Sequence, residues 1–571
     1  MTVDFAVPDF SEPPRTFGLS QDDEKAFVES LLDDVKTRRE LRRDKEATWK
    51  ACWKAYHSEM TVTPTKQQAD RNQVARPIIF QAVENLHNTV MSQLFPKSGR
   101  FFHVFGQGQA DQDDASRLET LLHHKLATQD FQSAFGLFLK QLLVTGNSVM
   151  MMPWHYEHGK RLRQVPLKRL GLTVGYTSEV QDVLLEQGPR FDVLNIQDVY
   201  IDESLKDWRD GTLIRRISKR MSQVLQEPRY LNTDAVVVQL KDVTKDDPKL
   251  SKLPSAEQPL TLLEVWGDLW IHDTCYENYV AVVVEETGTL IRFEPHGLET
   301  GQAPFVFASL IPVPHEGYGI GAVEKSLGLQ HAINTLTNQK LDILNLCINS
   351  PFTYLLNDDV FDPLSMEYRP GALIAVKNHD TLRPLPLVAQ NINLAFQEIE
   401  DLKIEVMETS GSLRLMTGAL EGSNNTPRTA TEVNTITENA HRKYDGMLMQ
   451  LEQDCLEPML QLVYELSKQF WIYPEELRFI ENEGSTARYE SVSPDVFQRS
   501  CCDIRVLGSR GQLKEEQELE SILFFLKTMQ ALPELLPRLN MDAIVKRIIR
   551  NLGFKDEELL RPADEPTPPA V

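Results

Sequence analysis

The chain has little of what marks a secreted, membrane or metal-binding protein. Its 571 residues include six cysteines, and apart from the adjacent Cys501 and Cys502 they stand alone, without a spacing for zinc. No run of 18 apolar residues occurs, so we expect no membrane span. The first residues lack the basic and apolar regions of a signal peptide. We therefore expect reduced, mostly buried thiols, a reducing compartment and no membrane partner.

Positive charge is also scarce. Lysine and arginine total 60 against 83 aspartates and glutamates, which gives a net charge of −23. Proteins that coat DNA or bind anionic membranes carry a basic surface, so this balance argues against both classes. It does not argue against a surface past which DNA slides without sticking.

Motifs for nucleotide binding or nucleophilic catalysis are missing. There is no Walker A loop, no G-x-S-x-G and no cysteine–histidine pattern. The segment from Gly317 to Ala322 fits G-x-G-x-x-A, but a dinucleotide site needs a strand immediately before it, and here Pro312 and Pro314 precede it. The pattern favours a flexible turn before a helix. We expect no enzyme and no cofactor.

Two groups of potential metal ligands are weak. His155 and His158 could share an ion with Glu157 beside them, but no third ligand is evident, and a surface loop is the favoured interpretation. An acidic group lacks the glycine and terminal glutamate of a calcium loop, so turn and helix capping are favoured over metal binding. Its members are Asp198, Asp202, Glu203, Asp207 and Asp210. We expect no metal site and no catalytic residue.

The first 300 residues predict helices followed by a β-rich region. With 41% hydrophobic residues the chain can form three or four structural regions. Residues 22–60 predict one helix, whose basic run could touch nucleic acid but whose acidic neighbours favour a solvated face with Trp49 and Trp53 as an anchor. Further elements are helices at 77–94, 111–128 and 131–143, strands at 99–105 and 148–152, and mostly strands in 160–300, including AVVVQL, with a linker near 241–259.

Residues 321–470 are the most distinctive stretch. A helix is predicted from Ala322 to about Asn349, a strand-like insert follows, and a second helix runs over 391–416. A loop without apolar residues (EGSNNTPRT) then leads to a helix from about Thr429 to Phe470, interrupted only by Pro458. At 1.5 Å per residue this last helix would be roughly 60 Å long, a length typical of a strut or an assembly element. Residues 471–511 are predicted to be irregular, and helices follow at 512–530 and 541–551.

This order of elements, together with four local motifs, resembles the portal (head-to-tail connector) proteins of tailed bacteriophages, closest to the short-tailed group. The motifs are LLVTGNSVMMM (142–152), FDVLNIQDVYIDESLKDWRDG (191–211), HEGYGIGAVEKSLGLQHAINTLTNQKLDIL (315–344) and RTATEVN (428–434). The resemblance covers about residues 20–550. It implies an α+β, predominantly helical portal fold that assembles as a ring, normally of twelve subunits, at one capsid vertex of the virion. Double-stranded DNA would pass through the ring during packaging and ejection.

The resemblance also implies how the chain is divided and with what it assembles. The parts are an N-terminal arm (1–18), a wing (19–320), a first stem helix (321–349), a clip (350–390), a second stem helix (391–416), a channel loop (417–429), a long wing helix (430–470), a crown (471–560) and a disordered tail (561–571). The implied partners are further copies of the chain, the large terminase subunit, a tail adaptor protein, and the major capsid and scaffolding proteins. Assembly would take place in the host cytoplasm.

Two sets of residues are candidates for contacts in such a ring. The candidates for the DNA channel are Lys340, Lys403, Arg414, Gly418, Gly422, Ser423, Asn424, Asn425 and Arg428. The candidates for docking the motor or tail, within the clip, are Asp358, Asp359, Asp362, Glu367 and Arg369. For the cations, the alternative is an ordinary surface or intersubunit ion pair. For the whole chain, the alternative is another structural virion or scaffold protein without a DNA channel.

Overall fold

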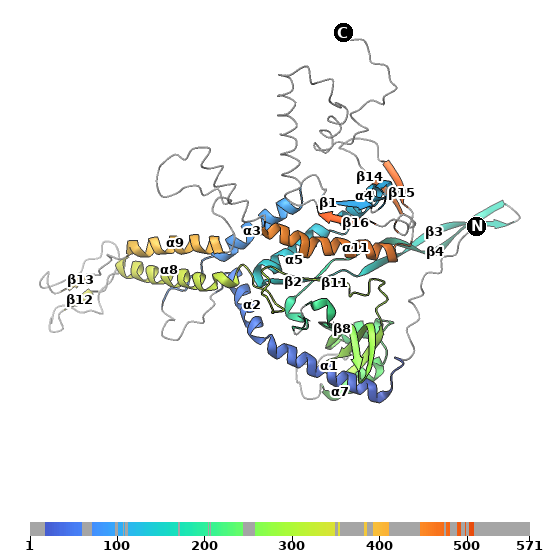
Figure 1. Ribbon diagram of the computed structural model, residues 1–571, viewed down its shortest axis with the longest axis horizontal. Helices are drawn as coiled ribbons and strands as arrows, with labels where there is room; N and C mark the ends of the chain where they lie inside the picture. Colours follow the sequence, from blue (N-terminus) through green and yellow to red (C-terminus); the bar gives the residue numbers. More distant parts are fainter. Residues whose placement is uncertain are drawn as a thin grey trace, which may run out of the picture.

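The computed structural model shows an α+β chain with two long projections (Figure 1). It describes residues 17–59, 71–96, 101–106, 108, 112–169, 172–203, 205, 207–243, 257–348, 352–354, 382–384, 392–409, 446–472, 475–479, 488–492, 497 and 502–506. The predicted channel loop, C-terminal helices and tail lie outside these ranges, as do the first 16 residues of the predicted N-terminal arm. Among the helices within them, none combines the length and the hydropathy needed to cross a bilayer.

Helices and two small sheets form the central body. The helices α3 (Ile78–Leu94), α4 (Gln112–Thr128) and α5 (Phe131–Thr145) confirm their predictions, and all contribute to one apolar core. One sheet has the strand order β11 (Phe305–Ser309), β2 (Asn147–Met151), β5 (Asp192–Leu194). In the other, β1 (Phe102–Gly106) pairs antiparallel with β16 (Cys502–Val506), the last strand of the described chain.

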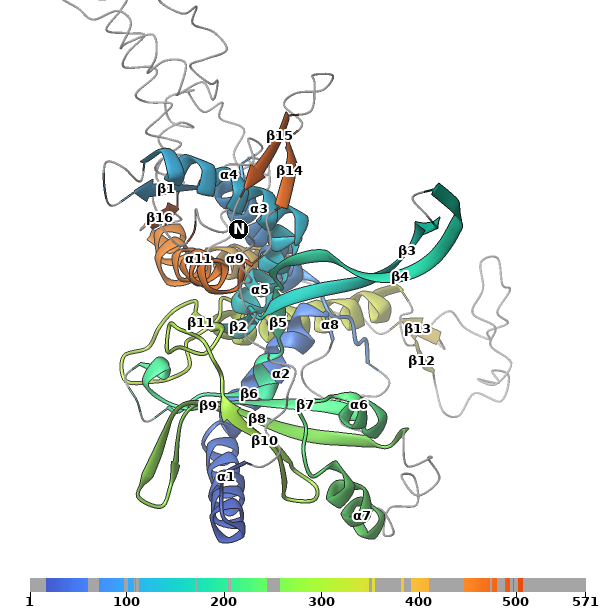
Figure 2. The same ribbon diagram turned by 90° about the vertical axis from the view of Figure 1, so that its right-hand side faces the viewer.

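A five-stranded antiparallel sheet forms a lobe below the body (Figures 1 and 2). Its strand order is β10 (Thr289–Pro295), β9 (Thr274–Val284), β8 (Pro259–Ile271), β7 (Leu213–Arg220), β6 (Val199–Tyr200). The helix α1 (Gln21–Leu41) packs on one face, and α6 (Met221–Gln226) and α7 (Thr233–Val243) pack on the other. The strand predicted for AVVVQL is therefore wrong. These residues form α7, in which Val236 and Leu240, one turn apart, are buried against the sheet.

The first predicted helix is in fact two helices. Helix α1 ends at Leu41 and α2 (Arg43–Tyr56) begins after Arg42, with a change of direction between them (Figure 1). The solvated face predicted for the basic run is also wrong in part. The side chains of Arg38 and Arg42 are 10% and 0% exposed, because both hydrogen-bond to backbone carbonyls of the lobe. Trp49, predicted as an anchor, is completely buried.

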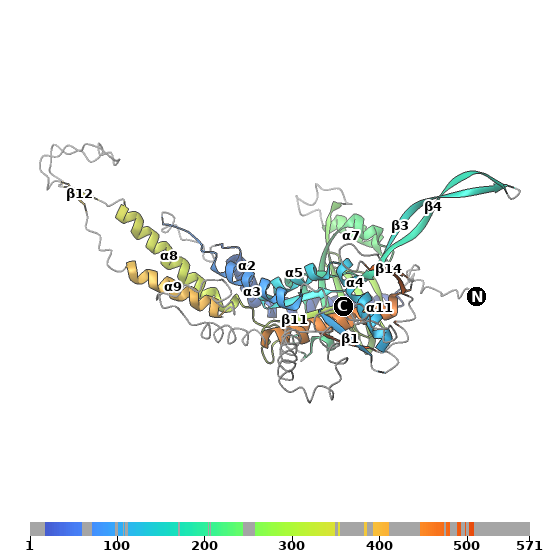
Figure 3. The same ribbon diagram turned by 90° about the horizontal axis from the view of Figure 1, so that it is seen from above.

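A long hairpin leaves the other side of the body (Figures 2 and 3). It consists of β3 (Trp154–Arg169) and β4 (Leu172–Pro189). The surface loop predicted around His155 and His158 is wrong, since both residues lie within β3.

The predicted long helix is described only in its second half. Residues 446–470 are helical without a break, as a short α-helical segment, a π-helical turn (Glu452–Leu456) and α11 (Glu457–Phe470). Pro458, expected to interrupt the helix, occupies its first turn after the π-helical turn, where a missing N–H is tolerated. Beyond it, the region predicted to be irregular contains the strand pair β14 (Glu475–Phe479) and β15 (Arg488–Val492), as well as β16.

Candidate functional site

Two antiparallel helices project from the body and form an arm (Figures 1 and 3). They are α8 (Leu327–Ile348), preceded by a 3-10 turn (Glu324–Ser326), and α9 (Ile392–Thr409). Both helices were predicted. At the far end of the arm lie two short paired strands, β12 (Phe352–Tyr354) and β13 (Leu382–Pro384), within the predicted strand-like insert.

The root of the arm is locked onto the body by a tight glycine contact. Gly146 ends α5 with φ at +82°, and a Cβ there would lie 2.3 Å from the backbone nitrogen of Gly321. Asn147 continues the contact, since its Oδ1 accepts from the Gly319 N–H at 2.8 Å and its Nδ2 donates to the Gly319 carbonyl at 3.2 Å. The flexible turn predicted for the glycine pattern is therefore a packed joint. Its glycines admit a neighbouring backbone.

One face of α8 is polar but buried. Gln330, Asn334 and Asn338 are at most 8% exposed, although amide side chains at such spacing look like a solvent face in the sequence. Together with Asp342 they follow one another every four residues along the helix. We call these four residues the polar ladder.

The polar ladder holds a segment of extended chain, residues 72–77, which we call the strap. Asp342 accepts from the Asn72 N–H at 2.9 Å, Asn338 from the Val74 N–H at 2.8 Å, and Asn334 from the Arg76 N–H at 2.9 Å. Four helical residues rise about 6 Å. Two extended residues span about 6.6 Å. The two distances match, so successive residues of the ladder contact alternate residues of the strap.

Three cations meet where the strap, α8 and α9 come together. Lys340 lies on α8 with its Nζ 3.2 Å from the centroid of the Phe396 ring of α9. Partial burial, and then the like charges of Arg76 and Lys403, lower the pKa of the Lys340 ammonium, while Glu400 opposes the shift. Lys403 also pairs with Glu400 at 2.5 Å. We call Arg76, Lys340 and Lys403 the cation cluster.

The cation cluster contains both predicted channel residues that the structure describes. Lys340 and Lys403 come from different helices and are brought to one place, and Arg76 joins them from a segment that the sequence did not single out. The remaining channel candidates (Arg414, Gly418, Gly422, Ser423, Asn424, Asn425, Arg428) and all the clip candidates (Asp358, Asp359, Asp362, Glu367, Arg369) lie outside the described residues. The polar ladder was not predicted either, although polar residues at every fourth position of 330–342 indicate it in the sequence.

Five large apolar side chains are exposed along the outer part of the arm. They are Ile343, Leu346, Ile348, Leu394 and Phe396, with exposures from 42% to 69%. Scattered apolar side chains are normal on a surface, but a group on one projecting element is typical of a contact with another molecule.

Among the acidic residues of the β-rich region, Asp207 has the predicted capping role, whereas Asp198 forms an ion pair. Asp207 accepts from the Arg209 N–H at 3.0 Å and caps a 3-10 turn (Trp208–Asp210). Asp198 lies in another 3-10 turn (Ile196–Asp198) and forms an ion pair with Arg216 at 2.7 Å.

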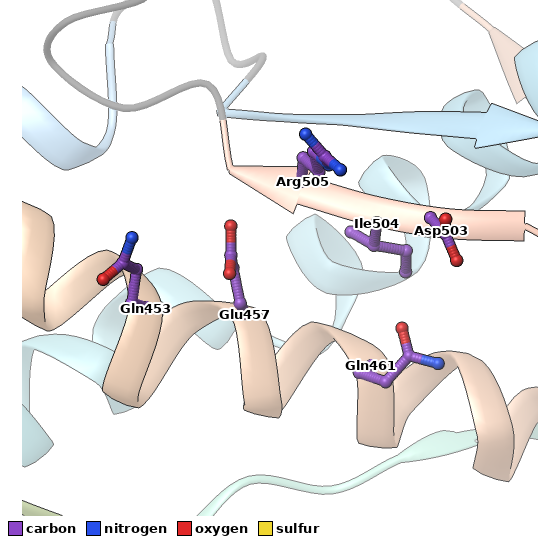
Figure 4. A pocket seen from close by; sticks show the side chains of 6 residues that line it. All are labelled: Gln453, Glu457, Gln461, Asp503, Ile504 and Arg505. Carbon is purple, nitrogen blue, oxygen red and sulfur yellow. The ribbon is translucent and has the colours of Figure 1, made fainter.

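A polar groove of about 410 Å³ lies between the long helix and β16 (Figure 4). Gln453, Glu457 and Gln461 line it from successive turns of the helix, and Asp503, Ile504 and Arg505 line it from the strand. Two carboxylates and a guanidinium beside an open groove are typical of a solvated polar face.

Comparisons with known proteins point to one family. Residues 171–570 match the model of a family described as "Phage SU10 portal protein". No individual curated protein gives a match. Among solved structures, "Virion of native gene transfer agent (GTA) particle" is 9% identical, covering 86% of this chain and 88% of that one, with a TM-score of 0.31. "Neck of native GTA particle computed with C12 symmetry" is 10% identical, covering 78% and 85%, with a TM-score of 0.30.

Proposed function

Because the chain belongs to the phage SU10 portal protein family, we propose that its copies form a ring at one capsid vertex and that DNA passes through the axis of this ring. The chain is a phage portal protein. The observation that carries the proposal is the arm. Two antiparallel helices project from a packed root, with a cluster of cations between them and exposed apolar side chains along their outer part.

The exposed apolar side chains of the arm fit the neighbouring arms of a ring. Ile343, Leu346 and Ile348 lie on the outer part of α8, and Leu394 and Phe396 lie on α9 where it returns. Each buried aliphatic or aromatic side chain contributes about 1.5–3 kcal/mol. In a closed ring every arm has two neighbours, so this surface would be covered without leaving an open end.

The charges fit a channel that passes DNA without holding it. Every copy has a net charge of −23, so a ring repels the duplex as a whole. The cation cluster gives each subunit a small local attraction, and an attraction that is small and screened by salt allows sliding. The partner of Lys403, Glu400, weakens it further.

The other assembly partners follow from the same role. We assign motor docking, by the large terminase subunit, and later tail docking, by an adaptor, to the far end of the arm, residues 350–390. The ring would be held in the virion by the major capsid protein after assembly with scaffolding protein. The chain itself would act as a conduit, without a reaction of its own.

The test replaces two members of the cation cluster by methionine, Lys340→Met with Lys403→Met, in phage or a packaging assay. We expect normal rings in electron micrographs but about threefold less packaged or retained DNA, because two local cations per subunit are lost. The control, Lys36→Met with Lys50→Met, removes the same charge from side chains that are 70% and 60% exposed on α1 and α2.

Three outcomes separate the alternatives. Equal DNA contents in the two double variants would remove the cluster from the channel while leaving the portal role intact. Rings without an axial hole wide enough for a duplex would favour a structural virion protein without a channel. Monomers under all conditions would overturn the ring itself.

A further inference from the structure

The hairpin β3–β4 is the second projection of the molecule. Its strands pair antiparallel from Trp154 with Pro189 at the base to Arg169 with Leu172 at the tip. The two strands form a sheet of their own. At about 3.3 Å per residue, a strand of this length reaches roughly 50 Å. Figures 2 and 3 show it extending away from the body, on a side different from that of the arm.

The hairpin is held firmly at its base. The Tyr156 hydroxyl donates to the Phe470 carbonyl at 2.7 Å, and the ammonium of Lys125 donates to the Gln187 carbonyl at 2.9 Å. Gln187 is completely buried, whereas Val180, farther out on the same strand, is 61% exposed. The base of the hairpin is therefore packed onto the body, and its outer part is not.

A hairpin of this kind calls for a partner. Two strands alone are only marginally stable in water, because each has an unpaired edge and neither face is covered. Long open edges also pair readily with other chains. A projection kept at this length is best explained by a contact that covers its outer part.

The charge of the hairpin changes along its length. Between Lys160 and Arg169, β3 has five lysines and arginines and no acidic residue. Lys160 stands opposite Asp182, and Arg163 opposite Glu179, so the middle of the hairpin is balanced across the strands. The tip differs, because there Lys168 and Arg169 stand opposite Thr173 and Leu172.

We propose that the β3–β4 hairpin is an assembly arm whose basic tip binds the surface of the neighbouring copy in the ring. This inference rests on the proposed ring. The occupant is a second copy for two reasons. A basic tip complements a chain whose net charge is −23, and a reach of roughly 50 Å suffices to cross onto an adjacent subunit.

The first test reverses the charge of the tip, Lys168→Glu with Arg169→Glu. We expect about tenfold fewer rings at equal protein concentration in native mass spectrometry, because like charges then face each other across the contact. The melting profile of the protomer should not change. The control, Lys36→Glu with Arg43→Glu, makes the same charge change on side chains that are 70% and 84% exposed and should assemble normally. Equal ring yields from both double variants would overturn the proposal.

The second test needs no loss of assembly. A photo-crosslinking residue, p-benzoylphenylalanine, is placed at the exposed Val180, and assembled rings are irradiated. Covalent dimers and higher multimers of this chain on a denaturing gel would support the assembly arm. Rings without such multimers, or crosslinks in the particle only to DNA or to another capsid protein, would overturn it. Ring formation by the unmodified chain reports separately on the proposed function.

Discussion

Two regions of the molecule bury polar helix faces, and they do so in different ways. At the junction of α1 and α2, Arg38 and Arg42 insert guanidinium groups into the lobe; we call this pair with its contacts the Arg42 corner. Arg42 donates to the carbonyls of Gln197 at 2.7 Å and Val199, and its guanidinium lies 3.9 Å from the centroid of the Tyr200 ring. On α8 the polar ladder uses neutral amides, apart from Asp342, to hold the strap.

The difference concerns how far each contact depends on a single side chain. One guanidinium at the corner donates to several carbonyls and lies over three aromatic rings, those of Trp49, Tyr200 and Tyr318. Its removal leaves all these groups without their shared donor. In the ladder each amide serves one or two strap residues, so a loss stays local. We infer that the corner fixes the lobe to the body as one unit, whereas the strap can loosen stepwise.

The largest predicted effect comes from Arg42→Met. The substitution keeps an unbranched side chain but removes the donors to Ile196, Gln197 and Val199. We expect a loss of about 3–5 kcal/mol, because several buried acceptors lose their partner at once. Urea unfolding followed by tryptophan fluorescence measures it, since Trp49 packs beside the guanidinium.

The adjacent Arg43 provides a matched control. Its side chain is 84% exposed, so Arg43→Met should change stability by less than about 0.5 kcal/mol. Equal urea midpoints for Arg42→Met and Arg43→Met would show that the Arg42 corner does not stabilise the lobe. The inference that the corner fixes the lobe to the body would then be wrong.

A smaller effect is expected from Asn338→Leu in the polar ladder. The amide both accepts from the Val74 N–H and donates to the Val74 carbonyl, at 2.8 Å and 3.1 Å. Leucine keeps the volume but leaves both backbone groups unpaired, at a cost of about 1–3 kcal/mol. Hydrogen exchange at Val74 should then accelerate by about 10- to 100-fold, while the exchange of the lobe stays unchanged.

The neighbouring Gln339 is exposed, so Gln339→Leu is the control for added hydrophobicity. Faster exchange throughout the protein in Asn338→Leu would show that the strap unfolds together with the body. The stepwise behaviour inferred for the ladder would then be wrong.

These two regions also show what the sequence could predict. Apolar periodicity placed α3 and α5, because their buried faces repeat at helical spacing. It failed for AVVVQL, where four apolar or small residues in a row fit a strand as well as a helix buried against a sheet. It failed at Arg42 because nothing in a basic run distinguishes a buried guanidinium from a solvated one; the carbonyls that receive it lie more than 150 residues away.

The candidate site shows the same limit. Lys340 and Lys403 could be chosen from the sequence because they lie on the two predicted helices of the arm. Arg76 could not, since its position depends on the strap and therefore on a ladder of amides that look like solvent-facing residues. A scan for polar residues repeating every four positions inside an otherwise apolar helix would have indicated the ladder.

The smallest predicted effect separates the two regions by pH. Glu203 lies close to the Arg42 corner; burial raises the pKa of its carboxyl, and the nearby Arg42 and Arg38 only partly offset this. A raised carboxyl pKa means that the folded state binds more protons than the unfolded state, so stability falls as pH rises from about 4.3 through the folded pKa. Glu203→Gln should therefore be more stable than the natural chain at pH 7, by less than about 1 kcal/mol because the side chain is partly exposed.

This gain should vanish near pH 4, whereas the loss in Asn338→Leu should be constant over the same range, since an amide does not titrate. Urea midpoints measured between pH 4 and pH 8 provide the check, and a gain that increases towards low pH would mean that Arg42 and Arg38 stabilise the Glu203 carboxylate.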